Sequence, residues 1–477
     1  MPSSRLKEFY QKMKGAKVAV LGVGISNRPL IRFIHSLGAE ITAFDALPYD
    51  DRVLSKTRED FEKEGIFLQW SVGDKYLSRL ATDSFTYIFR TPQMRPDIAP
   101  IREAIAGGSI LTSEMEVFMD LCPAKIFAVT GSDGKTTTTT LLSLFLKEAG
   151  YRVFLGGNIG TPLLNRIAEV QADDMVVLEL SSFQLFHMAK SADVSVVTNI
   201  SPNHLNVHTD YQEYIDVKKN IFRYQSYSGR LVLNADNDLT RAMMIEKRGE
   251  GVYFSGDPQN IPDTAIQTEK IVVRDGSVYW EGKEKKALLS VSDILLPGAH
   301  NVENYMAAMG ATCPWVSPEI FTKVARSFPG VEHRSELVRT YKGIRIYNSS
   351  IDSSPNRTIH TLRTFAERGD RGVLIAGGAD KKSDYTGVGD TILRVCDRIV
   401  LCGPNATQIK EALKKEANGR SYQVFEVEIW DDLVQTAINL AVDGEIVILS
   451  PAGTSYDSFR HFEERGNRFK ELVSRLS

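Results

Sequence analysis

Short apolar runs recur along the whole chain, and stretches long enough for an amphipathic helix separate most of them. Strands of a parallel sheet are continuous apolar runs of this kind, because helices cover both faces of the sheet. The pattern therefore predicts an α/β protein whose sheets are mainly parallel. The predicted strands are 18–21, 40–44, 87–89, 126–129, 175–178, 194–199, 231–234, 344–347, 373–376, 399–401 and 446–449.

Proline and glycine interrupt this pattern at Leu121-Cys122-Pro123-Ala124 and again at Phe328-Pro329-Gly330. Both breaks are typical of linkers, and 477 residues are enough for two to four domains of ~100–200 residues each. We therefore predict three domains, at 1–123, 124–330 and 331–477. Between 251 and 297 the pattern becomes β-like, with strands at 270–274 and 277–280, which predicts a small antiparallel insertion in the middle domain.

Composition is that of an ordinary globular protein, with 43% hydrophobic and 25% charged residues. A net charge of −3 gives no electrostatic reason to expect nucleic acid or a membrane surface as a partner. The four cysteines form no C-x-x-C pair, the first 15 residues lack a signal-peptide pattern, and no apolar run reaches the ~18 residues of a membrane span. We expect a cytoplasmic protein.

The strongest chemical motif is Gly131-Ser132-Asp133-Gly134-Lys135-Thr136-Thr137, which lies between a predicted strand and a predicted helix. Glycines let backbone N–H groups close around phosphate oxygens, and the N-terminus of the following helix adds a partial positive charge. Lys135 would reach the β- and γ-phosphates of ATP, and the Thr136 hydroxyl would bind Mg²⁺. The loop is short, because Ala128 and Val129 stand where a P-loop has its first glycine. An ordinary glycine turn is the alternative.

Gly22-Val23-Gly24 follows the first predicted strand, and Asp45 ends the second, which is the start of a dinucleotide-binding fingerprint. Asn27 replaces the third glycine, so NAD binding, binding of another nucleotide and a plain structural turn all stay open. NAD binding would make the chain an oxidoreductase. An ATP loop in the next domain has no evident task in simple hydride transfer, which weighs against that alternative.

Polar side chains follow two predicted strands of the middle domain. Glu179 ends the run 175–178, where phosphate-loop proteins place an acid that holds Mg²⁺. His204 lies on the loop after 194–199 and is a candidate ligand at the same sheet edge. Asn199 and Ser201 are equally well explained as turn formers.

With these pieces the chain resembles the Mur ligases, and among them the members that add D-glutamate. The similarity spans nearly the whole chain, and the short phosphate loop is typical of the family. The segments Ser181-Ser182-Phe183-Gln184 and Phe462-Glu463-Glu464-Arg465-Gly466-Asn467 point to the D-glutamate-adding members. The matching segments are 130–136, 156–160, 178–185, 298–304, His333-Arg334, 377–381, 450–452 and 461–469.

The resemblance implies a Rossmann-like N-terminal domain for the UDP end of a substrate, a central P-loop ATPase domain and a Rossmann-like C-terminal domain that binds the amino acid and nucleotide. It implies an ATP-dependent ligase that adds D-glutamate to UDP-N-acetylmuramoyl-L-alanine through an acyl phosphate. ATP and two Mg²⁺ ions are the implied cofactors. The reaction would be a cytoplasmic step of peptidoglycan precursor synthesis, carried out by a monomer without nucleic-acid or membrane partners.

The resemblance also assigns residues. Lys135, Glu179, His204 and Lys218 are the implied catalytic residues, and Lys218, chosen over Lys219, is expected to be carbamylated. The implied metal ligands are Thr136, Glu179, His204 and carbamylated Lys218. ATP binding is implied for Gly131, Ser132, Asp133, Gly134, Lys135, Thr136, Thr137, Asn301, Asn304 and Arg334. The UDP substrate is expected at Gly24, Ile25, Ser26, Asp45 and Asn158, and the amino acid at Ser353, Lys381, Ser455 and Phe462.

Four positions depart from the family pattern. Ser349 and Ile351 replace an acid and a lysine, with Asp352 as a candidate substitute for the acid; Gln93 replaces a glycine, and Asp133 replaces an asparagine. These departures bear on affinity more than on reaction class, and Ser349, Ile351 and Gln93 motivate the second of two alternatives that stay open. One is another amide ligase of the Mur and folylpolyglutamate superfamily, and the other is a catalytically weak, nucleotide-gated regulatory protein.

Overall fold

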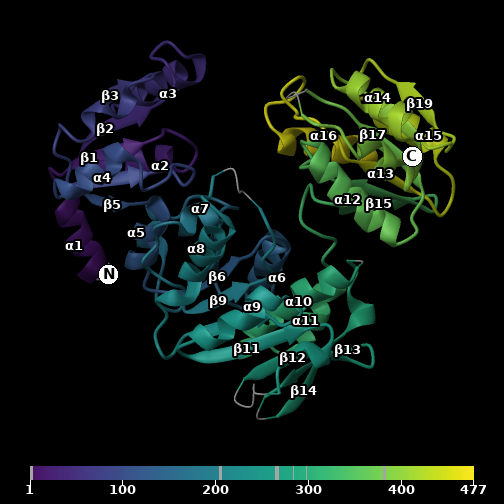
Figure 1. The fold of residues 1–477 in the computed structure, drawn as a ribbon, viewed down its shortest axis with the longest axis horizontal. Coiled ribbons are helices and arrows are strands. Elements are labelled where there is room, and N and C mark those ends of the chain that lie inside the picture. The colour runs from purple at the N-terminus through teal and green to yellow at the C-terminus, as the bar shows by residue number, and fades with distance from the viewer. Residues whose placement is uncertain are drawn as a thin grey trace. The chain divides into compact units, whose positions relative to one another are not determined.

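The computed structural model describes residues 4–203, 207–263, 268–282, 284–296, 298–379 and 383–476. The chain divides into two compact units, Met1–Ile294 with Ala299–Arg326, and Leu295–Gly298 with Ser327–Ser477. Within the described ranges the strands form three sheets, two in the first unit and one in the second (Figure 1). The mainly parallel α/β fold predicted from the sequence is confirmed.

The first sheet has the strand order β3-β2-β1-β4-β5, and every neighbouring pair is parallel. This order, with the first strand at the centre, is that of a Rossmann-like half. The carboxyl ends of β1 and β2 therefore lie side by side. The strands are β1 (Lys17–Leu21), β2 (Glu40–Asp45), β3 (Gln69–Val72), β4 (Tyr87–Arg90) and β5 (Ile110–Thr112).

The second sheet has the order β14-β13-β12-β11-β10-β9-β6-β8-β7. Its strands are β6 (Lys125–Thr130), β7 (Val153–Gly157), β8 (Met175–Glu179), β9 (Val194–Val197), β10 (Arg230–Asn234), β11 (Glu250–Ser255), β12 (Glu269–Arg274), β13 (Ser277–Glu281) and β14 (Lys285–Ser290). β6 lies between β8 and β9, so the residues that follow these three strands meet at one sheet edge.

The antiparallel insertion is present but starts later than predicted. β11 and β12 still run parallel to β10, and only β13 and β14 are antiparallel to their neighbours. Val194–Val197 also ends two residues before the predicted strand, because Thr198 and Asn199 turn toward the phosphate loop. The short strands β3, β5 and β7 were not predicted, since runs of three to five residues with mixed polarity carry little signal.

Helices of the first unit cover both sheets. α10 and α11 both pack on α6, and α10 also packs on β10, β11 and β12. α8 packs against β6 and α7. The helices are α1 (Ser4–Met13), α2 (Asn27–Ser36), α3 (Arg52–Lys63), α4 (Ala99–Ala106), α5 (Glu114–Leu121), α6 (Lys135–Glu148), α7 (Ser182–Leu185), α8 (Tyr211–Arg223), α9 (Asp238–Met243), α10 (Ala299–Thr312) and α11 (Pro318–Ala325).

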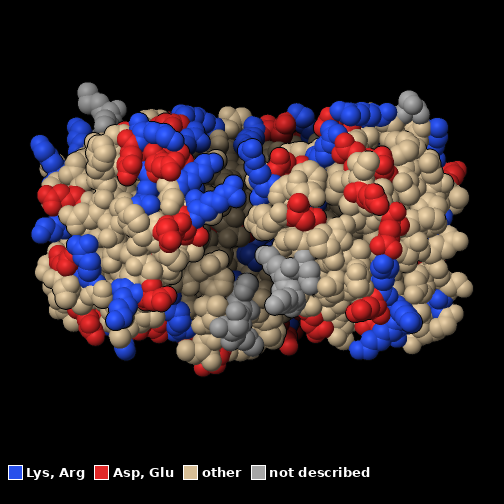
Figure 2. Space-filling view, turned by 90° about the horizontal axis from the view of Figure 1, so that it is seen from above, with Lys and Arg blue, Asp and Glu red and all other residues tan. Residues whose placement is uncertain are grey.

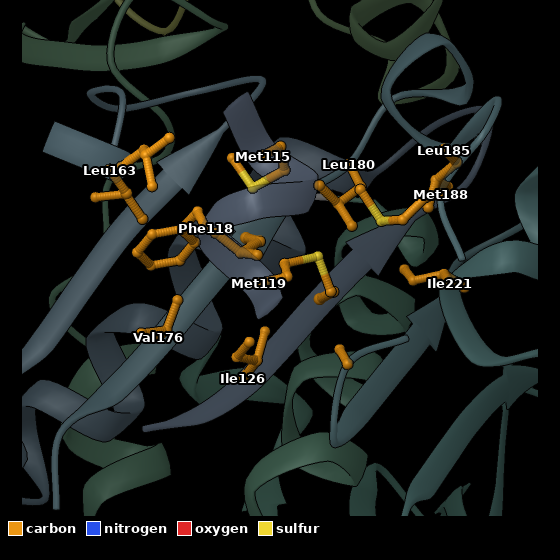
Figure 3. Packing of buried hydrophobic residues seen from close by; sticks show 14 of the residues in the cluster. Met115, Phe118, Met119, Ile126, Leu163, Val176, Leu180, Leu185, Met188 and Ile221 are labelled. Atoms are coloured by element: carbon orange, nitrogen blue, oxygen red, sulfur yellow. The ribbon is translucent and has the colours of Figure 1, made fainter. Parts of the chain in front are cut away.

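One large apolar cluster joins the two sheets of the first unit. Met115, Phe118 and Met119 of α5 pack with Ile126 and Val176 of the second sheet (Figure 3). The same cluster continues into β1 and α2 of the first sheet. The boundary predicted at 123/124 is thus a change of sheet inside one unit, and both predicted boundaries stay predictions.

The second unit holds a six-stranded sheet of order β15-β16-β20-β17-β18-β19, parallel except for β15. Its strands are β15 (Glu336–Tyr341), β16 (Ile344–Asn348), β17 (Gly372–Ala376), β18 (Cys396–Leu401), β19 (Gln423–Glu426) and β20 (Ile446–Leu449). Its helices are α12 (Pro355–Glu367), α13 (Val388–Leu393), α14 (Ala406–Glu416), α15 (Asp432–Leu440) and α16 (Phe462–Ser474).

Lysine, arginine, aspartate and glutamate side chains are interspersed on the face drawn in Figure 2. This mixture agrees with the small net charge of the sequence. Among the helices of the described residues, none combines the length and the apolar character needed to cross a membrane.

Candidate active site

The phosphate loop, residues 131–134, connects β6 to α6 and is held by the two residues that follow β9. Thr198 Oγ1 donates a hydrogen bond to the Asp133 carbonyl (2.6 Å), and the Asp133 N–H donates to Asn199 Oδ1 (2.9 Å). Ser132 Oγ lies 2.9 Å from the Tyr214 hydroxyl of α8. The loop is therefore fixed by side chains from two other segments, in addition to its own turn.

Glycine is required at both ends of this loop. Gly131 has φ +149°, and a Cβ there would lie 1.9 Å from Thr198 Oγ1. Gly134 has φ +76°, and a Cβ there would lie 2.3 Å from Asn304 Oδ1. Any side chain would displace these neighbours or the loop, so both positions favour glycine.

Lys135 is the first residue of α6, and its Nζ donates to the carbonyls of Gly131 (3.0 Å) and Ser132 (2.9 Å). The ammonium group therefore lies over the turn. The Asp133 side chain is exposed to solvent, so the acid that replaces the usual asparagine does not face the loop interior. Thr136 and Thr137 follow in the first turn of α6, half-buried.

Glu179 ends β8 beside the loop and is 1% exposed. Asn158 Nδ2 donates to Glu179 Oε1 (2.8 Å), and the Asn158 N–H donates to the Glu179 carbonyl (2.8 Å). Glu179 Oε2 is buried without a hydrogen-bond partner within the described part of the chain. A buried carboxylate oxygen left without a donor is suited to a cation.

Lys218 lies on the face of α8 that meets the phosphate loop, one turn after Tyr214. Its Nζ donates to the Gly131 carbonyl (2.8 Å) and to Thr130 Oγ1 (3.3 Å), and the residue is 2% exposed. Burial, with the charge of Lys135 as a second cause, holds the pKa of Lys218 well below its usual value. Lys219 points elsewhere and pairs with Glu246 at 2.7 Å.

These residues fit a divalent cation and a carbamylated lysine. A lysine with a lowered pKa is present in part as the neutral amine, the form that reacts with carbon dioxide. The described residues contain no cluster of three or more His, Cys, Asp or Glu side chains placed to hold a metal. His204, predicted as a ligand, lies outside the described residues.

The turn after β1 is closed by Asp45 and Asn27. Asp45 Oδ2 accepts from the Val23 N–H (2.9 Å), and Asn27 Nδ2 donates to the carbonyls of Gly22 (2.7 Å) and Leu21 (3.2 Å). Asn27 is 2% exposed, so it braces the turn where a third glycine was missing from the fingerprint. Gly24 and Ser26 precede α2, with Ile25 between them 85% exposed.

Gln93, which replaces a family glycine, is exposed, and its φ is not positive. Any residue can therefore take this backbone conformation. The turn runs from Thr91 to Met94, whose N–H donates to the Thr91 carbonyl (3.1 Å).

α10 places Asn304 beneath the phosphate loop. Thr138 Oγ1 donates to Asn304 Oδ1 (3.2 Å), and Asn304 Nδ2 donates to Asn301 Oδ1 (3.2 Å). Asn304 is 6% exposed. The structure therefore brings Asn304 to the start of α6, where it supports the turn at Gly134.

In the second unit, Arg334 and Asp352 lie near each other. Arg334 Nε is buried without a hydrogen-bond partner among the described residues, and the Arg334 charge acts on Asp352. Asp352 is 3% exposed and bonds to Ser450 Oγ (2.8 Å) and to Ser349; burial raises its pKa. An acid therefore stands beside Ser349, where the family acid is absent.

The predicted amino-acid site is represented by three described residues. Ser353 Oγ donates to the Ile351 carbonyl (3.1 Å), Ser350 Oγ donates to the Phe462 carbonyl (2.8 Å), and Ser455 is 2% exposed. Lys381 lies outside the described residues. The described contacts include no hydrogen bond that joins the side chains of Ser353, Ser455 and Phe462 to one another.

Sequence reasoning missed Thr198 as a support of the phosphate loop and left Asn199 as a turn former. Their position directly after a buried strand was the available signal, because strand ends next to a phosphate loop meet it in a parallel sheet. Which side chain turns toward the loop depends on the strand order, which the sequence did not reveal.

Comparison with known families gives two matches. The Mur ligase middle domain matches residues 129–312, and the Mur ligase glutamate ligase domain matches residues 333–453. The first range contains the phosphate loop, Glu179, Lys218 and Asn304.

Curated relatives match nearly end to end. A protein of Acetivibrio thermocellus named UDP-N-acetylmuramoylalanine–D-glutamate ligase is 48% identical, over 99% of this chain and 99% of the relative. A protein of Clostridium perfringens with the same name is 42% identical, over 98% of this chain and 99% of the relative.

Solved structures share the fold at lower identity. UDP-N-acetylmuramate–alanine ligase of Thermotoga maritima superposes with a TM-score of 0.56 at 18% identity, over 96% of this chain and 99% of that one. A pseudomurein peptide ligase type C of Methanothermus fervidus gives a TM-score of 0.51 at 17% identity, over 97% and 100%. The chain belongs to the Mur ligase family, whose members are ATP-dependent amide ligases.

Proposed function

We propose that the protein joins D-glutamate to UDP-N-acetylmuramoyl-L-alanine, with cleavage of ATP, in the cytoplasmic synthesis of peptidoglycan precursors. The observation that carries this proposal is the convergence of Lys135, Glu179, Asn158 and Lys218 around one glycine turn. Near full-length similarity to relatives named for this reaction supports the choice of substrates.

A free carboxylate is a poor acyl donor, so formation of an amide needs an activated acyl group. In the first step the L-alanyl carboxylate attacks the γ-phosphate of ATP, giving an acyl phosphate and ADP. In the second step the amine of D-glutamate attacks the acyl carbon, and phosphate leaves from the tetrahedral intermediate. Two anions meet in the first step, so positive charge at the loop decides the rate.

The residues of this chain have distinct tasks in that scheme. Gly131, Ser132, Asp133, Gly134 and Thr137 would form the turn and the helix N-terminus that hold the phosphates, and Lys135 would supply a cation. Asn158 would orient the UDP-sugar peptide, since its side-chain amide already lies against Glu179.

Two Mg²⁺ ions would be held by Thr136, Glu179, His204 and carbamylated Lys218. When bound, such ions neutralise phosphate charge and draw the reacting oxygens together. Within the described set, the unpartnered Glu179 Oε2 and the low pKa of Lys218 support this assignment.

The remaining assignments follow the same reasoning. We propose that residues 1–123 bind the UDP end of the substrate through Gly24, Ile25, Ser26 and Asp45. Residues 124–330 would bind ATP, with Asn301 and Asn304 near the nucleotide. Residues 331–477 would contribute Arg334 toward the phosphates and Ser353, Lys381, Ser455 and Phe462 toward D-glutamate, with the protein acting as a monomer.

Phosphate release from ATP and Mg²⁺ tests the proposal, measured with UDP-N-acetylmuramoyl-L-alanine and a panel of D- and L-amino acids, with product masses. We expect release with D-glutamate and a product heavier by one glutamyl residue. Release with another amino acid would contradict the substrate, and lack of release with all of them would contradict the enzyme assignment. Lys135→Ala should abolish release while leaving the melting temperature nearly unchanged.

A further inference from the structure

Arg90, at the end of β4, is a buried cation whose hydrogen-bond acceptors are all neutral. Its Nη1 donates to the carbonyls of Pro92 (2.9 Å) and Met94 (3.1 Å) and weakly to that of Thr91 (3.4 Å), and its Nη2 donates to the Phe183 carbonyl (3.1 Å). The residue is 2% exposed, and within the described ranges its hydrogen bonds go to backbone carbonyls and include no carboxylate.

Burial of an arginine in this way is unusual, because buried charges are normally paired with an opposite charge. Burial lowers the pKa of Arg90 to about 10. The guanidinium therefore still carries its charge at pH 7, and its hydrogen bonds to neutral carbonyls only partly compensate its lost hydration. A bound anion would supply the missing counter-charge.

Arg90 lines a pocket between the first sheet and the second sheet of the same unit. Ser26, Asn27, Gly157 and Gln184 are among the other lining residues. Asn27 begins α2, a helix of ten residues, so the positive end of that helix opens on the same pocket. Gly157 is the neighbour of Asn158, the residue proposed to orient the substrate.

The acidic groups near Arg90 are engaged elsewhere. Glu114 also lines the pocket, but its Oε1 accepts from the N–H groups of Leu163 (3.1 Å) and Leu164 (2.8 Å), and burial raises its pKa. Glu116, the carboxylate whose charge acts on Arg90, accepts from the Ala189 N–H (3.1 Å). Neither carboxylate pairs with the guanidinium.

We propose that the buried charge of Arg90 is the counter-charge for the diphosphate of the uridine nucleotide substrate, bound at the mouth of this pocket. The inference rests on the proposed function, because that function supplies a diphosphate between the first and second sheets. The pocket is narrow, so the anion would lie across its mouth, where the Arg90 charge acts through low-dielectric protein. The α2 N-terminus would bind it from the other side.

Calorimetric titration of the full-length protein with uridine, uridine monophosphate and uridine diphosphate tests the role of this charge. The variants are Arg90→Gln, which removes the charge, and Arg90→Lys, which keeps it. The matched control is Arg79→Gln, because Arg79 belongs to the same domain but pairs with Asp83 on the surface.

In Arg90→Gln we expect affinity for uridine diphosphate to fall roughly 10- to 100-fold and affinity for uridine to change less than about threefold. Arg90→Lys and the control should keep the preference for the diphosphate within about threefold of the wild type. An equal loss for uridine and uridine diphosphate would show that Arg90 only supports its loop, and an unchanged diphosphate affinity would also overturn the proposal.

Two further results keep the test decisive. If Arg90→Gln fails to fold, Arg90→Lys decides alone, and loss of its diphosphate preference overturns the proposal. The ligase assay on the wild type separates the two proposals. Turnover by the wild type, together with unchanged uridine diphosphate affinity in Arg90→Gln, would refute only the role of Arg90. An Arg90-dependent diphosphate preference without turnover refutes only the ligase.

Discussion

Gly134→Ala should damage the ATP site through backbone strain and through a clash with Asn304. Measuring the substitution in an Asn304→Ala background separates the two effects. Gly134 has φ +76°, a conformation that costs an L-residue about 1–2 kcal/mol. The new Cβ would also lie 2.3 Å from Asn304 Oδ1. The amide must then move, and its hydrogen bond from Thr138 Oγ1 is lost, at about 1 kcal/mol or more for a buried pair.

The sum of about 2–3 kcal/mol corresponds to a fall of roughly 30- to 150-fold in kcat/KM for ATP. In an Asn304→Ala background the steric term disappears, and only the backbone term of about 1–2 kcal/mol is left. Gly134→Ala should therefore cost about 1 kcal/mol less in that background, about fivefold in kcat/KM.

The assay is steady-state ATP turnover of the four members of the double-mutant cycle, with melting temperatures measured in parallel. Gly150→Ala is the matched control: Gly150 follows the other end of α6 with φ +94° and has no heavy atom near its would-be Cβ. It should carry the backbone cost in stability and leave kcat/KM unchanged. Additivity of Gly134→Ala and Asn304→Ala within about 0.3 kcal/mol would refute the steric reasoning.

Three other predictions concern single side chains. Lys218→Ala should reduce turnover by at least about 100-fold, while Lys219→Ala, which loses ion pairs with Asp216 and Glu246 away from the loop, should change it less than about twofold. Arg230→Met should lower the free energy of unfolding by about 2–4 kcal/mol, because Glu269 and the Gly310 carbonyl lose a buried donor; chemical denaturation measures this. Burial raises the pKa of Glu114, so the native state binds its proton more tightly and the wild type loses stability as pH rises above about 4.5. The melting temperature of Glu114→Gln should therefore gain on that of the wild type between pH 5 and pH 8, and a constant difference would contradict this.

The sequence predicted the long, apolar strands well because their burial pattern is local. β6, β8, β10, β17 and β20 all fall within two residues of the predicted ranges. The order of those strands could not be predicted, since it depends on pairing between distant segments. The same limit explains why β11 and β12, which read as part of the insertion, are parallel continuations of the main sheet.

Site residues could be predicted where they belong to one local sequence motif. They could not be predicted where the fold brings them together from distant segments. Lys135 and Glu179 could be named from strand, turn and helix signals. Lys218 required the family resemblance, because a Lys-Lys pair on a helix normally faces solvent, and only the fold shows that Lys218 alone is buried. Asn304 was expected at the nucleotide, and its placement under Gly134 came from the packing of α10 on α6.

The shortness of the phosphate loop has a physical explanation in these contacts. A standard P-loop is longer and contains an additional glycine, so its own backbone wraps around the phosphates. Here β6 continues through Thr130, and the turn is closed from outside, by Thr198 and Asn199 on the Asp133 peptide groups. Because α8 also contacts the loop through Tyr214 and Lys218, the loop keeps its shape only when three separate segments are in place. The ATP site of this protein is therefore a property of the folded sheet edge, and a peptide carrying the motif alone should not bind phosphate in this geometry.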